Sequence, residues 1–309
     1  MTAPKGQVAH MAQSQNRPVA GVLWMLVTGV MFVAVTAIVK YVGDDLPAAQ
    51  AAFLRYLLGL VFLIPMIGPI RRAKLSARAL RLFGLRGAMH TIGVALWFFA
   101  MTKISIAEVT AMNYLAPVYV TIGAAFFLGE KLALRRIMAI VFALVGAMVI
   151  LRPGFRELSP GHLAMLVTAV MFAGSYLTAK VMADEVSPAV VVGMLSITVT
   201  IGLAPLAAMV WVTPTLAQLG WMFVLACFAT TGHYTMTLAF QAAPVTVTQP
   251  VTFLQLFWAV LLGAFVFDEG IDGWVIFGGL IILAAVSFIT WREAMLKRAT
   301  TPPVPATKV

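Results

Sequence analysis

Ten apolar stretches divide this sequence, and each is about as long as the twenty residues that an α-helix needs to cross a bilayer. They are residues 20–39, 46–67, 82–101, 108–127, 134–151, 161–181, 189–212, 218–239, 246–267 and 273–291. Turn-forming residues separate several of them, for example Arg152-Pro153-Gly154 and Ser187-Pro188. The pattern predicts an all-α integral membrane protein with ten transmembrane helices.

The composition excludes a water-soluble fold. Of the 309 residues, 62% are apolar and 10% are charged, whereas soluble domains have about 45–50% apolar and about 25% charged residues. The net charge of +10 comes from basic residues that flank the apolar stretches. No basic stripe alternates with aromatic residues, so a nucleic-acid partner is not expected. Cys227 is the only cysteine, which excludes a disulfide within the chain.

The distribution of positive charge predicts the orientation. With the N-terminus in the cytoplasm, fifteen Lys and Arg residues lie in inner segments and four lie in outer segments. Because basic residues accumulate on the cytoplasmic side, both termini are expected there, in a multi-pass protein of a bacterial inner membrane. The two remaining cations, Arg55 and Arg86, fall inside predicted spans.

The two halves of the sequence repeat each other. Residues 22–42 align without gaps on residues 162–182, with nine of 21 positions identical. A second match pairs the segment that ends at Glu130 with the segment that ends at Glu269. Five spans per half is an odd number, so the second half must cross the membrane upside down. The repeat therefore predicts a 5+5 inverted topology with a substrate site between the halves.

The expected organisation follows from this repeat. A cytoplasmic N-terminal tail covers residues 1–19, and the first five-helix repeat covers 20–151. An outer connection at 152–160 leads to the second repeat at 161–291, and a cytoplasmic C-terminal tail covers 292–309.

Short motifs at the helix ends resemble those of a known family. They are FLRY at 53–56, LRG at 85–87, LAPVYV at 115–120 followed by LGEK, LRPG at 151–154 and VFDE at 266–269. Together they resemble the drug/metabolite transporter superfamily, in particular proteins with two EamA repeats, over about residues 20–292. The resemblance implies ten helices, cytoplasmic termini, a central cavity and alternating access without ATP. Family members carry amino acids, nucleotide-like metabolites, vitamins or drugs in either direction.

One position departs from the repeat. Leu256 stands where the first half has Pro117, and the second half has Pro250 instead. A kink in the ninth helix is therefore expected at a shifted position.

Signatures of catalysis are missing from the sequence. It contains no phosphate-binding loop, no HExxH motif and no GxSxG motif, and no pair of its four histidines has the spacing of metal ligands. We therefore expect no catalytic residue, no metal and no cofactor. A membrane-embedded sensor or enzyme is the alternative class, and the lack of a soluble domain disfavours it.

Charged residues near the spans have several interpretations. Arg55 either contacts a substrate carboxylate or carbonyl, or bonds to helix carbonyls, whereas Arg86 is expected to snorkel to the cytoplasmic surface. Glu108 is the candidate for proton coupling, with a solvated position at the helix start as the alternative. Glu130 and Glu269 are expected to stabilise the N-terminus of the helix that follows each of them.

Uncharged polar and aromatic residues inside the spans make the stronger case for a site. Amides and hydroxyls that face lipid would be unsatisfied, so they should face inward. The alternative is hydrogen bonding between helices. With Arg55, the candidate substrate-binding residues are Trp97, Asn113, Tyr114, His233, Tyr234, Gln249, Thr252 and Gln255. The small residues Ala139, Ala143 and Ala147 predict close helix packing or a homodimer contact.

These side chains favour a particular kind of small-molecule substrate. Amides, hydroxyls and aromatic rings suit a flat, largely uncharged solute with many hydrogen-bonding groups. A vitamin such as riboflavin, taken up across the membrane, is the substrate we favour by resemblance to the family. Export of amino acids or of drug-like metabolites is the alternative.

Overall fold

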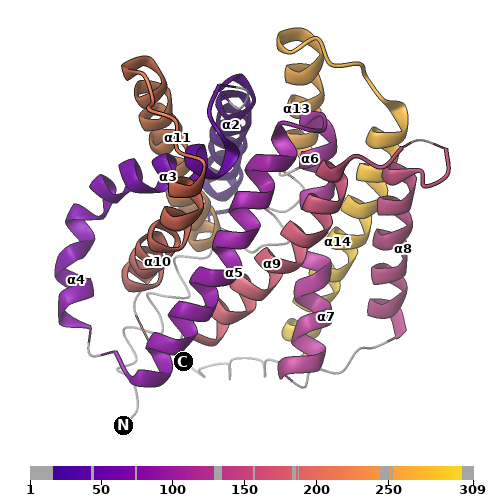
Figure 1. Ribbon diagram of the computed structural model, residues 1–309. Coiled ribbons are helices and arrows are strands. Elements are labelled where there is room, and N and C mark those ends of the chain that lie inside the picture. The colour runs from indigo at the N-terminus through magenta and orange to yellow at the C-terminus, as the bar shows by residue number, and fades with distance from the viewer. Residues whose placement is uncertain are drawn as a thin grey trace, which may run out of the picture.

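The computed structural model describes residues 17–42, 45–73, 75–128, 134–155, 157–182, 186, 188–243, 251 and 253–300. Regular structure in these ranges is helical (Figure 1). The first repeat contributes α2 (Pro18–Val42), α3 (Ala48–Gly59), η1 (Leu60–Met66), α4 (Ile67–Arg72), α5 (Ala77–Met101), α6 (Ile106–Asn113), α7 (Ala116–Leu128) and α8 (Leu134–Leu151). The second contributes α9 (Pro160–Met182), α10 (Pro188–Met209), α11 (Leu216–Ala242), α13 (Phe253–Val266) and α14 (Gly273–Thr300).

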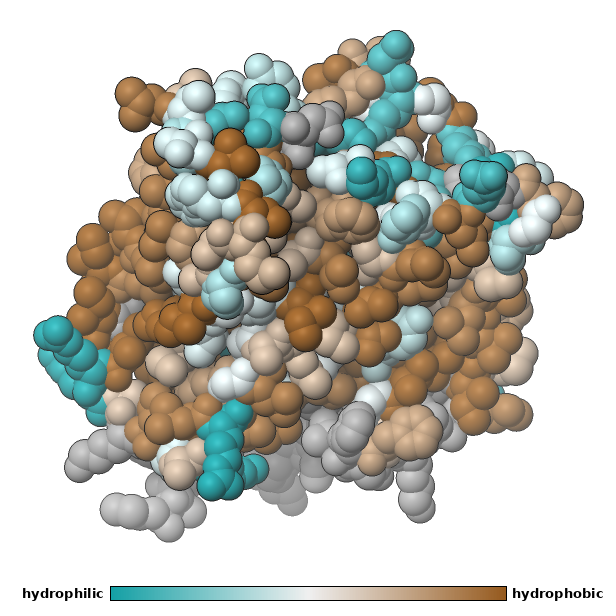
Figure 2. Space-filling view, viewed as in Figure 1, coloured by the Kyte–Doolittle hydropathy of each residue, from teal (hydrophilic) through white to brown (hydrophobic). Residues whose placement is uncertain are grey.

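The length and hydropathy of these helices confirm the membrane class. Five helical segments are long and apolar enough to cross a membrane: Val19–Val42, Ala48–Pro65, Ala77–Met101, Pro160–Ala179 and Val190–Met209. Shorter apolar helices occur at Ile137–Leu151, Leu254–Val266 and Gly273–Ile289. Figure 2 shows hydrophobic residues across the middle of one face, with hydrophilic residues gathered toward its upper and lower edges. Such a surface suits a lipid surrounding.

The helix pairs reflect the internal repeat. In the sequence, α2 is the repeat mate of α9, and α5 is the repeat mate of α11. In space, α2 packs along α11, and α5 packs along α9. Exchanging the two halves therefore converts one helix pair into the other. The remaining close pair, α8 with α14, joins the last helix of each half and maps onto itself.

Two glycines at equivalent positions allow these pairs to approach closely. Gly93 on α5 lies against α9, and a Cβ there would be 2.7 Å from the ring of Phe172. Gly232 on α11 lies against α2, and a Cβ there would be 3.3 Å from atoms of Met31 and Phe32. Phe32 and Phe172 are themselves repeat mates. The two contacts are therefore versions of one packing arrangement, tighter at Gly93.

The fourth span is broken, although the sequence predicts it as one segment over 108–127. Helix α6 ends at Asn113, and α7 begins at Ala116. The cause is Pro117, which has no N–H to donate to the carbonyl of Asn113 and whose ring clashes with that carbonyl in a regular helix. Half-helices of this kind occur at the substrate sites of several transporter folds. Pro250, where the sequence predicts the shifted kink of the ninth helix, lies outside the described residues.

The seam of small residues on α8 is used within the chain. Ala139 and Ala143 are buried, and α8 packs along α14. At the closest approach, a Cβ on Gly278 would be 2.6 Å from the carbonyl oxygen of Gly146. The seam therefore serves helix packing, the first of its two predicted roles. Helix α14 continues to Thr300, beyond the end of the predicted span at residue 291.

Candidate functional site

A hydrogen-bonded group links the two halves in the interior. His90 on α5 lies between Tyr56 of α3 and Ser175 of α9. Its Nε2 is 3.1 Å from the Tyr56 hydroxyl, and its Nδ1 is 3.2 Å from the Ser175 hydroxyl. Because Ser175 belongs to the second repeat, the imidazole bridges the two halves. The two helices that carry His90 and Ser175, α5 and α9, pack along each other (Figure 1).

Arg86 is one turn before His90 on α5, and its position corrects the sequence-based expectation. Because α5 begins at Ala77, Arg86 is about 13 Å into the helix at about 1.5 Å per residue. The side chain does not snorkel, since the residue is only 7% exposed. Its Nη1 donates to the carbonyl of Val191 on α10 at 3.0 Å. Its Nε is buried without a partner among the described residues.

Arg55 and His233 extend this polar group. The Arg55 guanidinium carbon is 4.2 Å from the ring centroid of Tyr56. His233 on α11 is exposed, and electrostatic interactions connect it with both Arg55 and Arg86. Tyr176 on α9, which is 48% exposed, likewise interacts with Arg86. We call the following residues the central cluster: Arg55, Tyr56, Arg86, His90, Ser175, Tyr176 and His233.

The internal repeat is also visible in two ring contacts in and beside the central cluster. The rings of His90 and Phe172 have centroids 5.0 Å apart. The rings of His233 and Phe32 are 5.2 Å apart. Since Phe32 and Phe172 are repeat mates, each half presents one phenylalanine to a histidine of the other half. Aromatic and imidazole faces of this kind can stack on a planar solute.

A second polar region surrounds the break between α6 and α7. The Oδ1 atom of Asn113 is buried and has no hydrogen-bond partner in the described part of the chain. Tyr114 shares a hydrogen bond with the backbone of Leu256 on α13. Gln255, the neighbour of Leu256, is half-buried. The structure therefore brings these candidates to the contact between α6 and α13, whereas Gln249 and Thr252 lie outside the described residues.

The remaining aromatic candidates, Trp97 and Tyr234, lie in different surroundings from each other. Trp97 on α5 is half-buried, packs against the apolar core, and makes an edge contact with Phe98 at 5.4 Å between centroids. Tyr234 follows His233 on α11 and leaves 62% of its surface exposed.

Glu108 is part of a buried capping arrangement. Its Oε2 accepts hydrogen bonds from the backbone N–H and the hydroxyl of Ser105, both at 2.9 Å, which closes a capping box at the start of α6. Its Oε1 is 3.0 Å from Nε2 of His162 on α9. The carboxylate is only 6% exposed, so the solvated position that the sequence also allowed is wrong.

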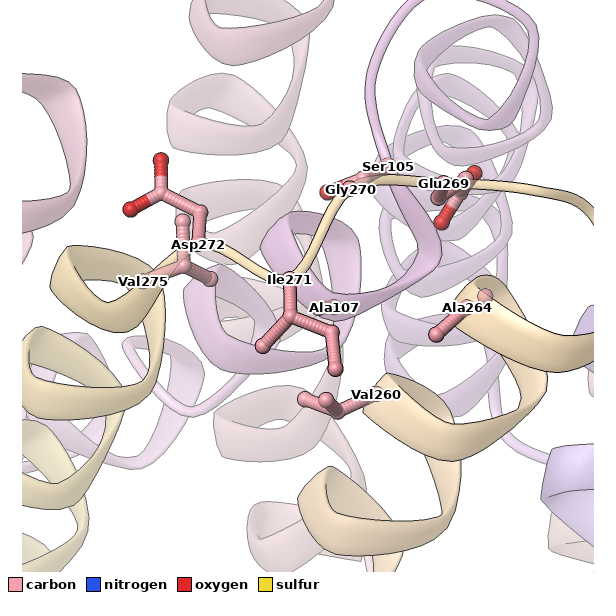
Figure 3. A pocket seen from close by; sticks show the side chains of 10 residues that line it. Ser105, Ala107, Val260, Ala264, Glu269, Gly270, Ile271, Asp272 and Val275 are labelled. Carbon is pink, nitrogen blue, oxygen red and sulfur yellow. The ribbon is translucent and has the colours of Figure 1, made fainter.

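Glu269 stabilises a different helix from the expected one. Its Oε2 accepts the backbone N–H of Ile106 at 3.0 Å, at the N-terminus of α6. Its Oε1 is 3.0 Å from Nζ of Lys40, at the end of α2. The start of α14 is served instead by Asp272, which accepts the N–H of Trp274 and also pairs with Arg152. Figure 3 shows Glu269 beside a small pocket that Ser105, Ala107, Val260 and Ala264 help to line.

Five members of the central cluster were not singled out from the sequence as site residues. They are spread over α3, α5 and α9, so only the packing of the halves brings them together: Tyr56, Arg86, His90, Ser175 and Tyr176. One signal was available, since Arg86 and His90 are four residues apart and share a helix face. Among the described residues, no group of three His, Cys, Asp or Glu side chains could hold a metal ion.

The apolar helices and the pairing of two related halves define a multi-pass membrane protein with the architecture of an inverted-repeat transporter. The chain belongs to the EamA-like transporter family, whose pattern matches residues 19–152 and 159–291. It is thus a member of the drug/metabolite transporter superfamily, in agreement with the motifs in its sequence.

Named relatives support this assignment at low identity. The chain is 26% identical over 280 residues to an S-adenosylmethionine uptake transporter of Rickettsia bellii, covering 90% of this chain and 96% of the relative. It is 27% identical over 290 residues to a riboflavin transporter of Vibrio cholerae, covering 92% and 97%. It is 24% identical over 268 residues to a pseudopaline exporter of Pseudomonas aeruginosa, covering 86% and 94%.

A solved crystal structure shares the fold. It superimposes with a TM-score of 0.59 at 17% identity, covering 90% of this chain and 99% of the other. The family and the relatives' names point to a transporter of small metabolites in a bacterial-type inner membrane rather than to an enzyme.

Proposed function

We propose that this protein is a secondary transporter that takes up a planar nitrogen heterocycle with a hydroxylated side chain. Riboflavin, which the family resemblance favours, belongs to this class, and so does S-adenosylmethionine. One relative is named for each compound. Both compounds combine a flat ring system, which aromatic side chains can stack on, with hydroxyls and ring nitrogens that need hydrogen bonds.

The observation that carries the proposal is the pair of histidine–phenylalanine contacts in the central cluster. His90 with Phe172 and His233 with Phe32 supply rings from both halves, the first pair tilted and the second edge-on. The hydroxyls of Tyr56, Ser175 and Tyr176 add hydrogen-bonding groups beside them. A solute held there touches both repeats, so a rocking motion of one half against the other would change the side from which the solute is accessible.

Counterflow into proteoliposomes without ATP tests the proposal. Vesicles loaded with unlabelled riboflavin or S-adenosylmethionine should accumulate the labelled form of at least one of them transiently. His90→Ala should abolish most of this exchange, because it removes the link between Tyr56 and Ser175. Leu216→Ala is the control, since Leu216 is 88% exposed at the start of α11.

The same vesicles separate the alternatives. Exchange of neutral amino acids without exchange of either heterocycle would contradict the proposal and favour the amino-acid exporter. If none of the compounds is exchanged, the proposal that the protein transports a heterocycle is also contradicted. An imposed gradient across oriented membrane vesicles then distinguishes uptake from export.

A further inference from the structure

The central cluster contains two cations, Arg55 and Arg86, and the helices that carry it contain no acidic residue. The sequence has no Asp or Glu between residues 46 and 107, between 158 and 183, or between 186 and 267. These ranges include α3, α5, α9, α10, α11 and α13. Within them, Arg55 and Arg86 both interact electrostatically with His90 and with His233. The central cluster thus holds two guanidinium groups that interact with the same two histidines, without an acidic side chain on any of these helices.

Among the described residues, the contacts of the two arginines leave hydrogen-bonding capacity unused. Arg86 uses one N–H to bond the carbonyl of Val191. Its Nε is buried without a partner in the described ranges. Arg55 lies over the face of Tyr56, a contact that uses the charge but none of the five N–H donors. A buried cation without an anionic partner is costly in a membrane, and such residues usually mark a substrate or ion pathway.

We infer that the substrate carries an anionic group, a carboxylate in the first instance, which binds the Arg55 and Arg86 guanidinium groups. The inference rests on the proposed function and specifies its substrate class. A guanidinium offers parallel N–H donors that match the two oxygens of a carboxylate. The histidine–phenylalanine faces then hold the heterocycle, and the arginines hold the anion at the other end of the solute.

These separate binding roles distinguish the two candidate substrates. S-adenosylmethionine has an α-carboxylate at its methionine end, away from the adenine, in addition to an ammonium and a sulfonium cation, whereas riboflavin has no ionised group at neutral pH. Of the two, only S-adenosylmethionine offers a carboxylate to the arginines, which favours a substrate of the amino-acid–nucleoside type. The flat, uncharged solute that the side chains of the spans suggest would leave both guanidinium groups without a counter-charge.

Matched pairs of competitors test the inference. One pair is S-adenosylmethionine and decarboxylated S-adenosylmethionine, and the other is flavin mononucleotide and riboflavin. Each of these four compounds is added at increasing concentration while the uptake of a labelled substrate is measured. The labelled substrate is the compound that shows counterflow. In the wild-type protein, the member with the added anion should compete at a concentration about tenfold to a hundredfold lower, as expected for hydrogen bonds to a charged group.

Variants of the arginines assign the preference to these residues. Arg55→Gln should reduce the ratio within the S-adenosylmethionine pair toward one, and Arg55→Lys should retain part of it. The matched control is Arg81→Gln, since Arg81 is an exposed cation near the start of α5. Because the wild-type ratio is measured first, the test stands even where a variant does not insert.

The outcomes separate the anion inference from the proposed function. Counterflow of a heterocycle with equal competition by both members of each pair would overturn the anion inference and leave the proposed function intact. The anion inference is likewise overturned if Arg55→Gln and Arg81→Gln keep the same ratio as the wild-type protein. If no heterocycle shows counterflow, the proposed function is overturned, and the anion inference with it.

Discussion

Lys40 at the end of α2 and Glu269 beyond α13 form an ion pair, with 3.0 Å between Nζ and Oε1, that joins the first half to the second. The pair also holds the turn between α5 and α6, because Lys40 donates to the carbonyl of Ile104 and Glu269 accepts from the N–H of Ile106. One end of the bundle is thus closed by contacts between the repeats. The repeat mates are Lys180 and Glu130, whose side chains lie outside the described part of the structure.

Removing this ion pair should open that end of the bundle. Lys40→Ala leaves the partly buried carboxylate of Glu269 without its cation, and should lower the free energy of unfolding by about 1–3 kcal/mol. In a Cys227→Ser background, a cysteine at Ala264 beside Glu269 (Figure 3) should react faster with an impermeant maleimide. Lys103→Ala is the control, because Lys103 is an exposed cation near the same end of α5. If the cysteine at position 264 reacts at the same rate with Lys40 intact, in Lys40→Ala and in Lys103→Ala, the ion pair does not close this end of the bundle.

The two equivalent glycines should differ in their tolerance of a methyl group. Gly93→Ala forces a Cβ to 2.7 Å from the Phe172 ring, and should destabilise the protein by about 1–3 kcal/mol. Gly232→Ala meets its neighbours at 3.3 Å and should cost less. Gly84 is on α5, as Gly93 is, and a Cβ there meets nothing within 4 Å. Gly84→Ala should therefore be neutral or stabilising. Thermal unfolding in detergent checks the order, and a Gly93→Ala protein as stable as Gly84→Ala would contradict it.

The polar region at the helix break gives a prediction about affinity. Asn113→Ala and Gln255→Ala should each weaken substrate binding by about 1–3 kcal/mol, since a substrate group would lose its hydrogen bond. Gln249→Ala should act in the same direction. Leu254→Ala, an exposed neighbour on α13, serves as the control. If all three polar variants transport with unchanged apparent affinity, these residues serve only packing between helices.

Reporter fusions test the orientation. The excess of basic residues in the segments expected inside predicts that Val309 is cytoplasmic. Alkaline phosphatase fused there should therefore be inactive, and a fluorescent protein that is dark in the periplasm should be bright. An active phosphatase at this position would reverse the predicted topology.

Local patterns predicted much of the fold because a bilayer leaves few choices. Apolar length identified the spans, and the match of residues 22–42 to 162–182 identified the two halves. The break at Asn113 was missed because Pro117 lies within a continuous apolar segment, where the hydropathy shows no interruption. Its cause is local, and the position of the proline alone was sufficient to predict it.

The central cluster was harder to predict because its members are distant in sequence. His90 is 34 residues from Tyr56 and 85 from Ser175, and only the α3–α5 and α5–α9 contacts bring them together. Arg86 was assigned to the surface because its predicted span began at residue 82, whereas α5 begins at Ala77. A shift of five residues at one helix end was enough to hide a buried cation.

Protection of a single cysteine tests most directly whether the substrate binds where the halves meet. Tyr176→Cys in a Cys227→Ser background places the only thiol within the central cluster, at a position whose native side chain is 48% exposed. Phe155→Cys provides the reference, since Phe155 is 92% exposed between α8 and α9. Saturating S-adenosylmethionine or riboflavin should slow maleimide labelling at position 176 several-fold and leave labelling at position 155 unchanged. Equal labelling of Tyr176→Cys with and without a compound that the same protein transports would contradict a site in the central cluster.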